Sequence, residues 1–272
     1  MPRHAPHLKR CRRVYFDLDT VLLDAAQALC IALPAAGVPA WLLRLTGRGW
    51  ALLAPASLLG TLIAISLAPG SADVLTWIAL ILVPPGCALG LGWAMHGAKP
   101  WLGVLAVPLL LIALDAPEGT LGRVARIVLI VGSTATAGRL LAAAAPLALL
   151  KVGVVLMAVI DAVLVMGDQF DEQFAGFDAA TPGAGLPQLQ LARIGPVATD
   201  YGDYFLAGLV GAILAAQRGP QLAAAVAMLV VAEAWNQLFL VVDSLPNTTA
   251  PALVLVGWEL WRRRAARAAV TA

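Results

Sequence analysis

The chain has 272 residues, of which 61% are hydrophobic and only 12% are charged, and its mean hydropathy is +0.86. A soluble domain is about half apolar and about a quarter charged, so this composition excludes a water-soluble fold and predicts an all-α bundle of transmembrane helices in a lipid bilayer. The net charge is only +2, and the basic residues cluster at the two ends of the chain without interleaved aromatic residues, which is typical of membrane-flanking charge rather than of a nucleic-acid surface.

Nine stretches of the chain are candidates for a spanning helix, which needs about 20 mostly apolar residues, although the fourth and the ninth are short. They follow a basic tail over residues 1–20 and cover residues 21–43, 50–68, 74–95, 100–115, 123–145, 147–167, 199–216, 221–243 and 249–264. We divide the bundle into five N-terminal spans (21–145) and a C-terminal group (146–264), followed by a tail over 265–272. The first stretch is the most polar, and its sequence is compatible with a spanning, a surface or a re-entrant helix.

The start of the chain resembles two other kinds of segment. Asp17, Asp19 and Asp24 fall where the apolar core of a cleaved signal peptide would lie, which excludes that interpretation. The stretch from Phe16 to Asp24 also resembles the Asp-x-Asp motif of haloacid dehalogenase phosphatases, but it lacks the glycine before Thr20. The apolar chain that follows supplies no soluble α/β domain, so we interpret this match as fortuitous.

The three cysteines do not have the spacing of metal ligands. Cys11, Cys30 and Cys87 form at most one bridge, so the sequence predicts neither a disulfide framework nor a zinc site. We expect no metal and no organic cofactor.

One connection, residues 168–198, is long, acidic at its start and then rich in glycine and proline. Residues 186–194 alternate partly in polarity, which predicts a short strand. In a nine-span arrangement this loop falls on the side opposite most of the Lys and Arg residues. Because positive charge favours the cytoplasmic side, we expect an external loop and a cytoplasmic C-terminus. The arginine- and alanine-rich composition is typical of a prokaryotic protein, which places it in the plasma membrane.

Four acidic residues stand out within the predicted spans, because a carboxylate near the bilayer centre costs several kcal/mol and is therefore a functional candidate. For Asp24 and Glu233 we favour a structural polar contact, with Asn236 and Gln237 available to Glu233 one turn later. Asp161 is flanked by long apolar runs, and Asp203 opens another on the next span. Because consecutive helices usually pack together, these two carboxylates are expected to meet.

Two carboxylates in contact at low dielectric share one proton. An aspartic protease uses this arrangement: the ionised member takes a proton from water, and the protonated member hydrogen-bonds the scissile carbonyl. Gly202 and Gly208 lie close to Asp203 along the chain and would allow a substrate backbone to approach.

Three short motifs then resemble one family. Residues 158–163 are similar to the segment around the first catalytic aspartate of presenilin and signal peptide peptidase. Residues 200–203 (Asp-Tyr-Gly-Asp) resemble the Gly-x-Gly-Asp motif of that family, and residues 251–253 match its Pro-Ala-Leu motif. The motifs occur in the family's order on the sixth, seventh and ninth predicted spans. The resemblance covers residues 147–264.

The resemblance implies a presenilin-like fold and an intramembrane aspartyl protease that cleaves transmembrane helices or signal-peptide-like segments. Asp161 and Asp203 would be the catalytic acid and base, and the loop would add a strand to the substrate. The same comparison assigns substrate binding to Gly202, Pro251, Ala252 and Leu253, and a modulating role to Ile160, Asp200 and Tyr201.

The chain departs from the family pattern at three positions. Ile160 stands where the family has tyrosine, Asp200 stands where it has the first glycine, and Val254 stands where many members have a second proline. These differences leave a catalytically inactive scaffold open. A transporter or channel that uses the intramembrane acids also remains open, although it would predict repeat symmetry that the sequence does not show. Prepilin peptidases rank lower, because the lysine that follows their motif is missing.

Overall fold

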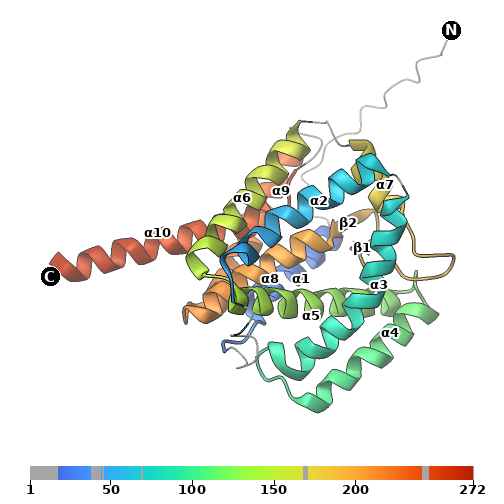
Figure 1. Cartoon of the computed structure of the whole chain (residues 1–272), viewed down its shortest axis with the longest axis horizontal. Coiled ribbons are helices and arrows are strands. Elements are labelled where there is room, and N and C mark those ends of the chain that lie inside the picture. The colour runs from blue at the N-terminus through green and yellow to red at the C-terminus, as the bar shows by residue number, and fades with distance from the viewer. Residues whose placement is uncertain are drawn as a thin grey trace, which may run out of the picture.

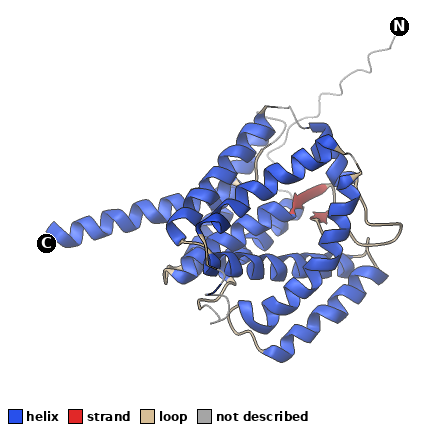
Figure 2. Cartoon of the chain, in the orientation of Figure 1, coloured by secondary structure: helices blue, strands red, loops and turns tan. Residues whose placement is uncertain are grey.

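The computed structural model describes residues 18–37, 44, 46–68, 70–167, 171–240 and 245–271. These residues form helices throughout, with a single β-hairpin, which confirms the predicted all-α class (Figures 1 and 2). The α-helices are α1 (Leu18–Ala32), α2 (Leu53–Leu67), α3 (Ser71–Leu89), α4 (Ala106–Asp115), α5 (Thr120–Ala144), α6 (Leu147–Met166), α7 (Asp171–Ala179), α8 (Tyr201–Ala216), α9 (Gln221–Asn236) and α10 (Thr249–Thr271). Shorter helical segments extend several of them: 3₁₀ turns at Arg48–Leu52, Pro100–Leu105 and Gln237–Leu240, and a π-helical turn at Gly90–Ala94.

Four of the described helical stretches are long and apolar enough to cross a membrane, judged by length and composition. They are Arg48–Leu67, Ser71–Ala94, Thr120–Ala144 and Leu147–Met166. Three further apolar helices are shorter: Pro100–Asp115, Tyr201–Ala216 and Gln221–Asn236. These seven stretches correspond to predicted spans two to eight, because each is a mainly apolar run bounded by turn-forming or charged residues, although the helix of span eight ends at Asn236 rather than at residue 243.

The first predicted span, 21–43, is wrong in its extent. Helix α1 ends at Ala32, because Pro34 lacks an N–H and disfavours helical geometry at Leu33. The chain then pairs with the end of the π-helical turn, where Pro34 bridges Met95 and the Ala35 N–H donates to the Ala94 carbonyl at 2.8 Å. Residues 38–43 of that predicted span lie outside the described residues. Helix α1 packs against α5, α8 and α9, so it is an interior helix and not a surface helix.

Two other predicted boundaries are corrected. The tail expected over 265–272 is helical as far as Thr271, since alanine and arginine are strong helix formers. Figure 1 shows this end of α10 projecting from the bundle. The expected loop over 168–198 contains helix α7, which the sequence analysis missed. The predicted strand in 186–194 is β1 (Leu191–Ile194), and it pairs antiparallel with β2 (Val197–Asp200), so that α8 begins at Tyr201 and not at 199.

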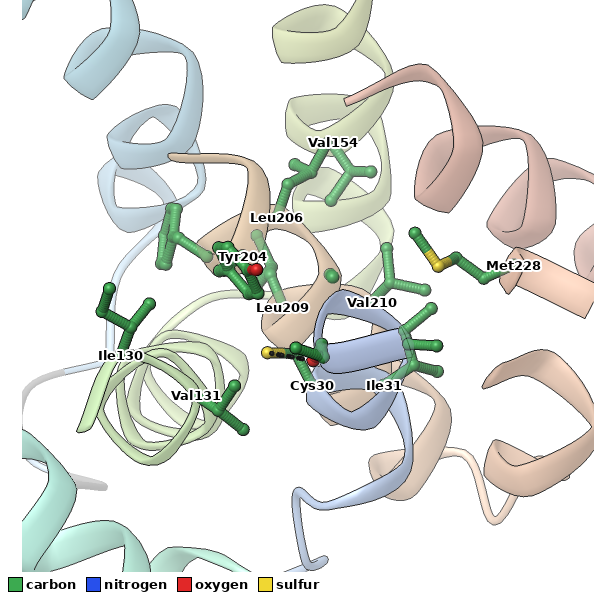
Figure 3. Close-up of a cluster of buried hydrophobic side chains, with 14 of the residues drawn as sticks. Cys30, Ile31, Ile130, Val131, Val154, Tyr204, Leu206, Leu209, Val210 and Met228 are labelled. Carbon is green, nitrogen blue, oxygen red and sulfur yellow. Dashed lines mark hydrogen bonds between the residues drawn. The ribbon is translucent and has the colours of Figure 1, made fainter. Parts of the chain in front are cut away.

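Helix α8 lies at the centre of the bundle, where all residues from Asp203 to Ala215 are buried. Small residues allow its close approach to α5: a Cβ added at Gly208 would lie 2.6 Å from the Thr134 carbonyl oxygen, and one added at Gly138 would lie 2.5 Å from the Gly208 carbonyl. Figure 3 shows side chains of α8, including Tyr204, Leu206 and Leu209, packed among residues of α1, α5, α6 and α9. This packing holds the first turn of α8 inside the bundle.

Polar contacts join α6, α8 and α10 far from that first turn. The Lys151 ammonium of α6 pairs with the Glu259 carboxylate of α10, and Arg262 donates to the same carboxylate at 3.0 Å. Gln217 follows the end of α8. When its side-chain amide is turned so that the nitrogen donates to Glu259 at 3.2 Å, its oxygen accepts from the Lys151 ammonium. These contacts fix the relative positions of α6, α8 and α10.

Candidate active site

The β-hairpin delivers the Asp-Tyr-Gly-Asp motif to the interior. The turn residue Gly195 has φ +55°, a left-handed conformation that favours glycine. Asp200 at the end of β2 lies opposite Leu191 of β1, and the Tyr201 N–H donates to the Gln190 carbonyl at 2.7 Å. The last strand residue is therefore directly followed by the first turn of α8.

Asp200 caps the N-terminus of α8. Its Oδ1 accepts the Asp203 backbone N–H at 3.0 Å, and it also accepts the Gly202 N–H. Aspartate is among the preferred residues at this position, because its side chain satisfies N–H groups that have no partner in the helix. This geometry shows that Asp200 has a structural role as the cap of helix α8.

Asp161 of α6 and Asp203 of α8 are both buried in the interior, within electrostatic reach of each other. Each side chain is 7% exposed, and each carboxylate interacts electrostatically with the other and with that of Asp200. Asp161 lies five residues before the end of α6, which is about 8 Å along the helix axis. The three carboxylates therefore lie at the end of the bundle that carries the hairpin and α7.

The segment that precedes α10 binds both members of the pair. The Thr248 hydroxyl donates to Asp161 Oδ2 at 2.5 Å, and the Thr248 backbone N–H donates to the same carboxylate. The side chain of Asn247 donates a hydrogen bond to Asp203. The sequence analysis missed both residues, although they stand immediately before the Pro-Ala-Leu motif, which was the available signal.

Polar side chains from α1 and α5 fix the same region. Gln27 is 1% exposed and donates to the Asp203 carbonyl at 3.1 Å and to the Asn247 carbonyl at 3.5 Å. The Tyr204 hydroxyl donates to the Leu23 carbonyl at 3.3 Å, and the Tyr201 and Ser133 hydroxyls are 2.8 Å apart. These contacts orient the α8 backbone around Asp203. Gln27 was not singled out from the sequence, where it is one polar residue in the doubtful first span.

An apolar cavity of about 380 Å³ lies beside the carboxylates. Helices α2 and α3 form its long walls, and the motif Asp200, Tyr201 and Gly202 forms one end. It is lined by Leu53, Ser57, Leu58, Thr61, Leu62, Ile65, Leu75, Ile78, Ala79, Leu82, Val83, Ala137, Met157, Phe177, Gln190, Asp200, Tyr201, Gly202 and Phe205.

The two predicted catalytic carboxylates do not line this cavity. It reaches Gly202, which neighbours Asp203, and Met157, which precedes Asp161 by one turn of α6. The Oε1 atom of Gln190 is buried at its edge and has no hydrogen-bond partner among the described residues. The cavity therefore has a long apolar wall and an unpaired acceptor, Gln190 Oε1. The aspartate pair lies close by, and a movement of side chains or helices would be needed to expose it to the cavity.

The remaining predicted site residues differ in how deeply they are buried. Pro251 and Ala252 are buried in the first turns of α10, whereas Leu253 is 47% exposed. None of these three lines the cavity, so the motif is connected to the aspartates through Asn247 and Thr248 instead. Ile160 is half-buried beside Asp161.

The other two acids singled out in the predicted spans, Asp24 and Glu233, form a separate group between α1 and α9. Asn236 donates to Asp24 Oδ2 at 2.7 Å, and the charge of Glu233 acts on Asp24. The predicted structural contact of Asp24 is therefore present. The partners expected for Glu233 are wrong: Asn236 binds Asp24, Gln237 donates to the Glu233 backbone carbonyl at 3.3 Å, and Glu233 Oε1 is a buried atom without a partner in the described part of the chain.

Among the residues that the structure describes, no group of three or more His, Cys, Asp or Glu side chains is arranged to hold a metal ion. The comparisons with known proteins found no match to this chain among family models, curated proteins or solved structures. The functional argument therefore rests on the geometry of the site.

Proposed function

We propose that this chain is an intramembrane aspartic protease related in mechanism to presenilin and signal peptide peptidase. The observation that carries the proposal is the joint burial of Asp161 and Asp203, with Thr248 and Asn247 bound to their carboxylates. Such an arrangement costs several kcal/mol in a low-dielectric interior, and a proton-sharing pair is the chemistry that uses it.

The reaction needs only the pair, one water molecule and a peptide bond. The ionised carboxylate removes a proton from water as the water oxygen attacks the scissile carbonyl carbon. The protonated carboxyl donates its proton to the carbonyl oxygen, which forms a gem-diol. When the diol collapses, the amide nitrogen receives a proton and the C–N bond breaks. The products are a carboxyl and an amine terminus, and the pair again holds one proton.

The substrate class follows from the cavity. Its walls are apolar side chains of α2 and α3, which fit a transmembrane or signal-peptide segment better than a polar peptide. The free Oε1 of Gln190 would accept one backbone N–H of a substrate that is locally unwound. Unwinding is required, because an intact helix hydrogen-bonds its own peptide groups.

The bilayer arrangement that accompanies this proposal is a multi-pass protein of a prokaryotic plasma membrane with a cytoplasmic C-terminus. Arg262, Arg263 and Arg264 at the projecting end of α10 support this orientation through the preference of positive charge for the cytoplasmic side. Single cysteines placed at Gly257 and at Arg264 and probed with a membrane-impermeant thiol reagent, in a background without the native cysteines, test it.

The decisive experiment is cleavage of a single-span peptide by the purified protein in liposomes, read by mass spectrometry of both products. Asp161→Asn and Asp203→Asn are each expected to abolish cleavage, because asparagine keeps the shape but does not shuttle the proton. Glu233→Gln is the matched control, an acid-to-amide change in the second group, and is expected to have a milder effect. Equal loss in all three variants, with folding intact, would count against a two-acid mechanism.

A proton- or cation-coupled transporter is the second candidate, and the Asp24, Glu233 and Asn236 group favours it. Gln27, three residues after Asp24 on α1, reaches the Asp203 backbone, so the two acidic groups are joined by a short polar path. Proton flux into liposomes that stops in Glu233→Gln but needs no peptide would support this candidate. An inactive scaffold would show neither flux nor cleavage.

A further inference from the structure

Asp200 stands where the family motif has glycine, and the proteolytic reaction as written does not use it. Of the three carboxylates, it is the one that lines the apolar cavity. Asp161 and Asp203 lie behind it, within electrostatic reach of its side chain. Any substrate or water that enters from the cavity therefore meets Asp200 before it meets the pair.

Burial and the charges of Asp161 and Asp178 disfavour the ionised form of Asp200, whereas its position at the N-terminus of α8 favours it. The Asp203 and Gly202 N–H groups both donate to its carboxylate, and the positive end of the helix dipole points toward it. Its charged neighbours come from three elements: Asp161 on α6, Asp203 on α8 and Asp178 on α7. When Asp200 is ionised, its negative charge beside a proton-sharing pair disfavours loss of the shared proton.

We propose that Asp200 is a positioning residue for the aspartate pair, which orients Asp203 through its backbone N–H and holds one proton on the pair up to higher pH. The inference rests on the proposed protease function. It gives a reason for the departure from the glycine of the family motif: the aspartate adds a charge and a helix cap at the entrance to the site. Glycine would provide neither.

The charge and the cap are separated by two variants. Asp200→Asn keeps the cap, because asparagine caps helices as well as aspartate, but removes the charge. Asp200→Ala removes both. Because the pair has to hold one proton, the cleavage rate is expected to have a bell-shaped pH profile. Without the negative charge, both limbs of the bell are expected to move to lower pH in Asp200→Asn, by about one unit for a charge several ångströms away.

The first measurement is the pH profile of peptide cleavage for wild type, Asp200→Asn and Asp115→Asn, the last being an exposed acid at the end of α4 that controls for charge removal. A displaced bell in Asp200→Asn alone supports the proposal. Coincident profiles of wild type and Asp200→Asn, with Asp200→Ala merely less stable, would reduce Asp200 to a helix cap. Complete inactivity of Asp200→Asn at every pH would make it a reacting acid, and would equally overturn the positioning role.

A second measurement does not depend on cleavage. Infrared spectroscopy follows the carbonyl band of protonated carboxyl groups, and the component lost in Asp161→Asn and Asp203→Asn reports the pair. This component is expected to disappear at lower pH in Asp200→Asn than in wild type, whether or not a substrate is cleaved. If the band moves and no peptide is cleaved, the protease proposal fails while the electrostatic role of Asp200 stands. An unmoved band refutes that role.

Discussion

Replacement of Gly208 by alanine is expected to separate α5 from α8 and to move Asp203 relative to Asp161. The added Cβ would lie 2.6 Å from the Thr134 carbonyl oxygen and 2.9 Å from its carbon. Both atoms belong to the α5 backbone, so no side-chain rotation relieves the overlap. The two helices have to move apart.

The size of the effect follows from that distance. Restoring an ordinary contact requires a displacement of roughly 0.8 Å, and a gap of that size forfeits about a quarter to a half of the dispersion energy of the atoms that line it. Overpacking of this kind typically costs about 1–3 kcal/mol. Because Asp203 is in the same helix, five residues before Gly208, cleavage should fall together with stability.

Thermal unfolding in detergent, followed by circular dichroism, measures the stability of Gly208→Ala against that of Gly60→Ala. Gly60 of α2 is the matched control, because an added Cβ there has no atom within 4 Å. Alanine at Gly60 should stabilise the helix by about 0.5–1 kcal/mol, since glycine loses more backbone entropy on folding. The two substitutions are therefore expected to have opposite signs. Equal midpoints, or a Gly208→Ala variant as stable and active as wild type, would refute this account of the α5–α8 interface.

Three further substitutions test the contacts around the site. Thr248→Val should lose about 1–3 kcal/mol of stability and most of the cleavage activity, because it removes the hydroxyl bound to Asp161, while Thr248→Ser should retain both; equal behaviour of the two variants would contradict this role. Lys151→Met should destabilise the protein by about 1–3 kcal/mol, because Glu259 loses its main partner. In a thermal double-mutant cycle, the double variant with Glu259→Gln should recover part of this loss. Additive losses of the two substitutions would argue against a coupled pair. Ala79→Trp should fill the cavity and raise the peptide concentration needed for half-maximal cleavage without lowering the unfolding midpoint, and unchanged kinetics would exclude this cavity as the substrate path.

Much of the helical architecture could be predicted from the sequence, since apolar runs of about 20 residues have few other structures available. Spans two to seven are recovered as helices within about three residues of their predicted ends, and span eight is recovered as α9, which ends at Asn236. The errors arose where local rules conflict. Pro34 ends α1 inside a run that is still apolar, and the Ala/Arg stretch after residue 264 continues a helix although its composition is that of a tail. Helix α7 was missed because its residues are polar and carry no clear periodicity.

The candidate site was predictable in part. Asp161 and Asp203 stand out in the sequence because an acid in an apolar run is costly, and the usual packing of consecutive helices predicts that they lie near each other. The roles of Asn247, Thr248 and Gln27 were not predictable. They lie 86, 87 and 134 positions from Asp161 in the chain, and an isolated Thr or Gln in a polar turn or a short helix has no pattern that marks it.

By itself, then, the sequence predicted most of the helical segments, an apolar environment for the chain, and which two acids are out of place in that environment. These properties depend only on composition and on spacing along the chain, both of which are given by the sequence. Only the tertiary structure decided that the segment before α10 binds both carboxylates, that Asp24 rather than Glu233 takes Asn236, and that Asp200 faces the cavity. Each of these depends on side-chain direction where helices from distant parts of the chain cross, and that direction is set by close packing of the whole bundle at glycines such as Gly138 and Gly208.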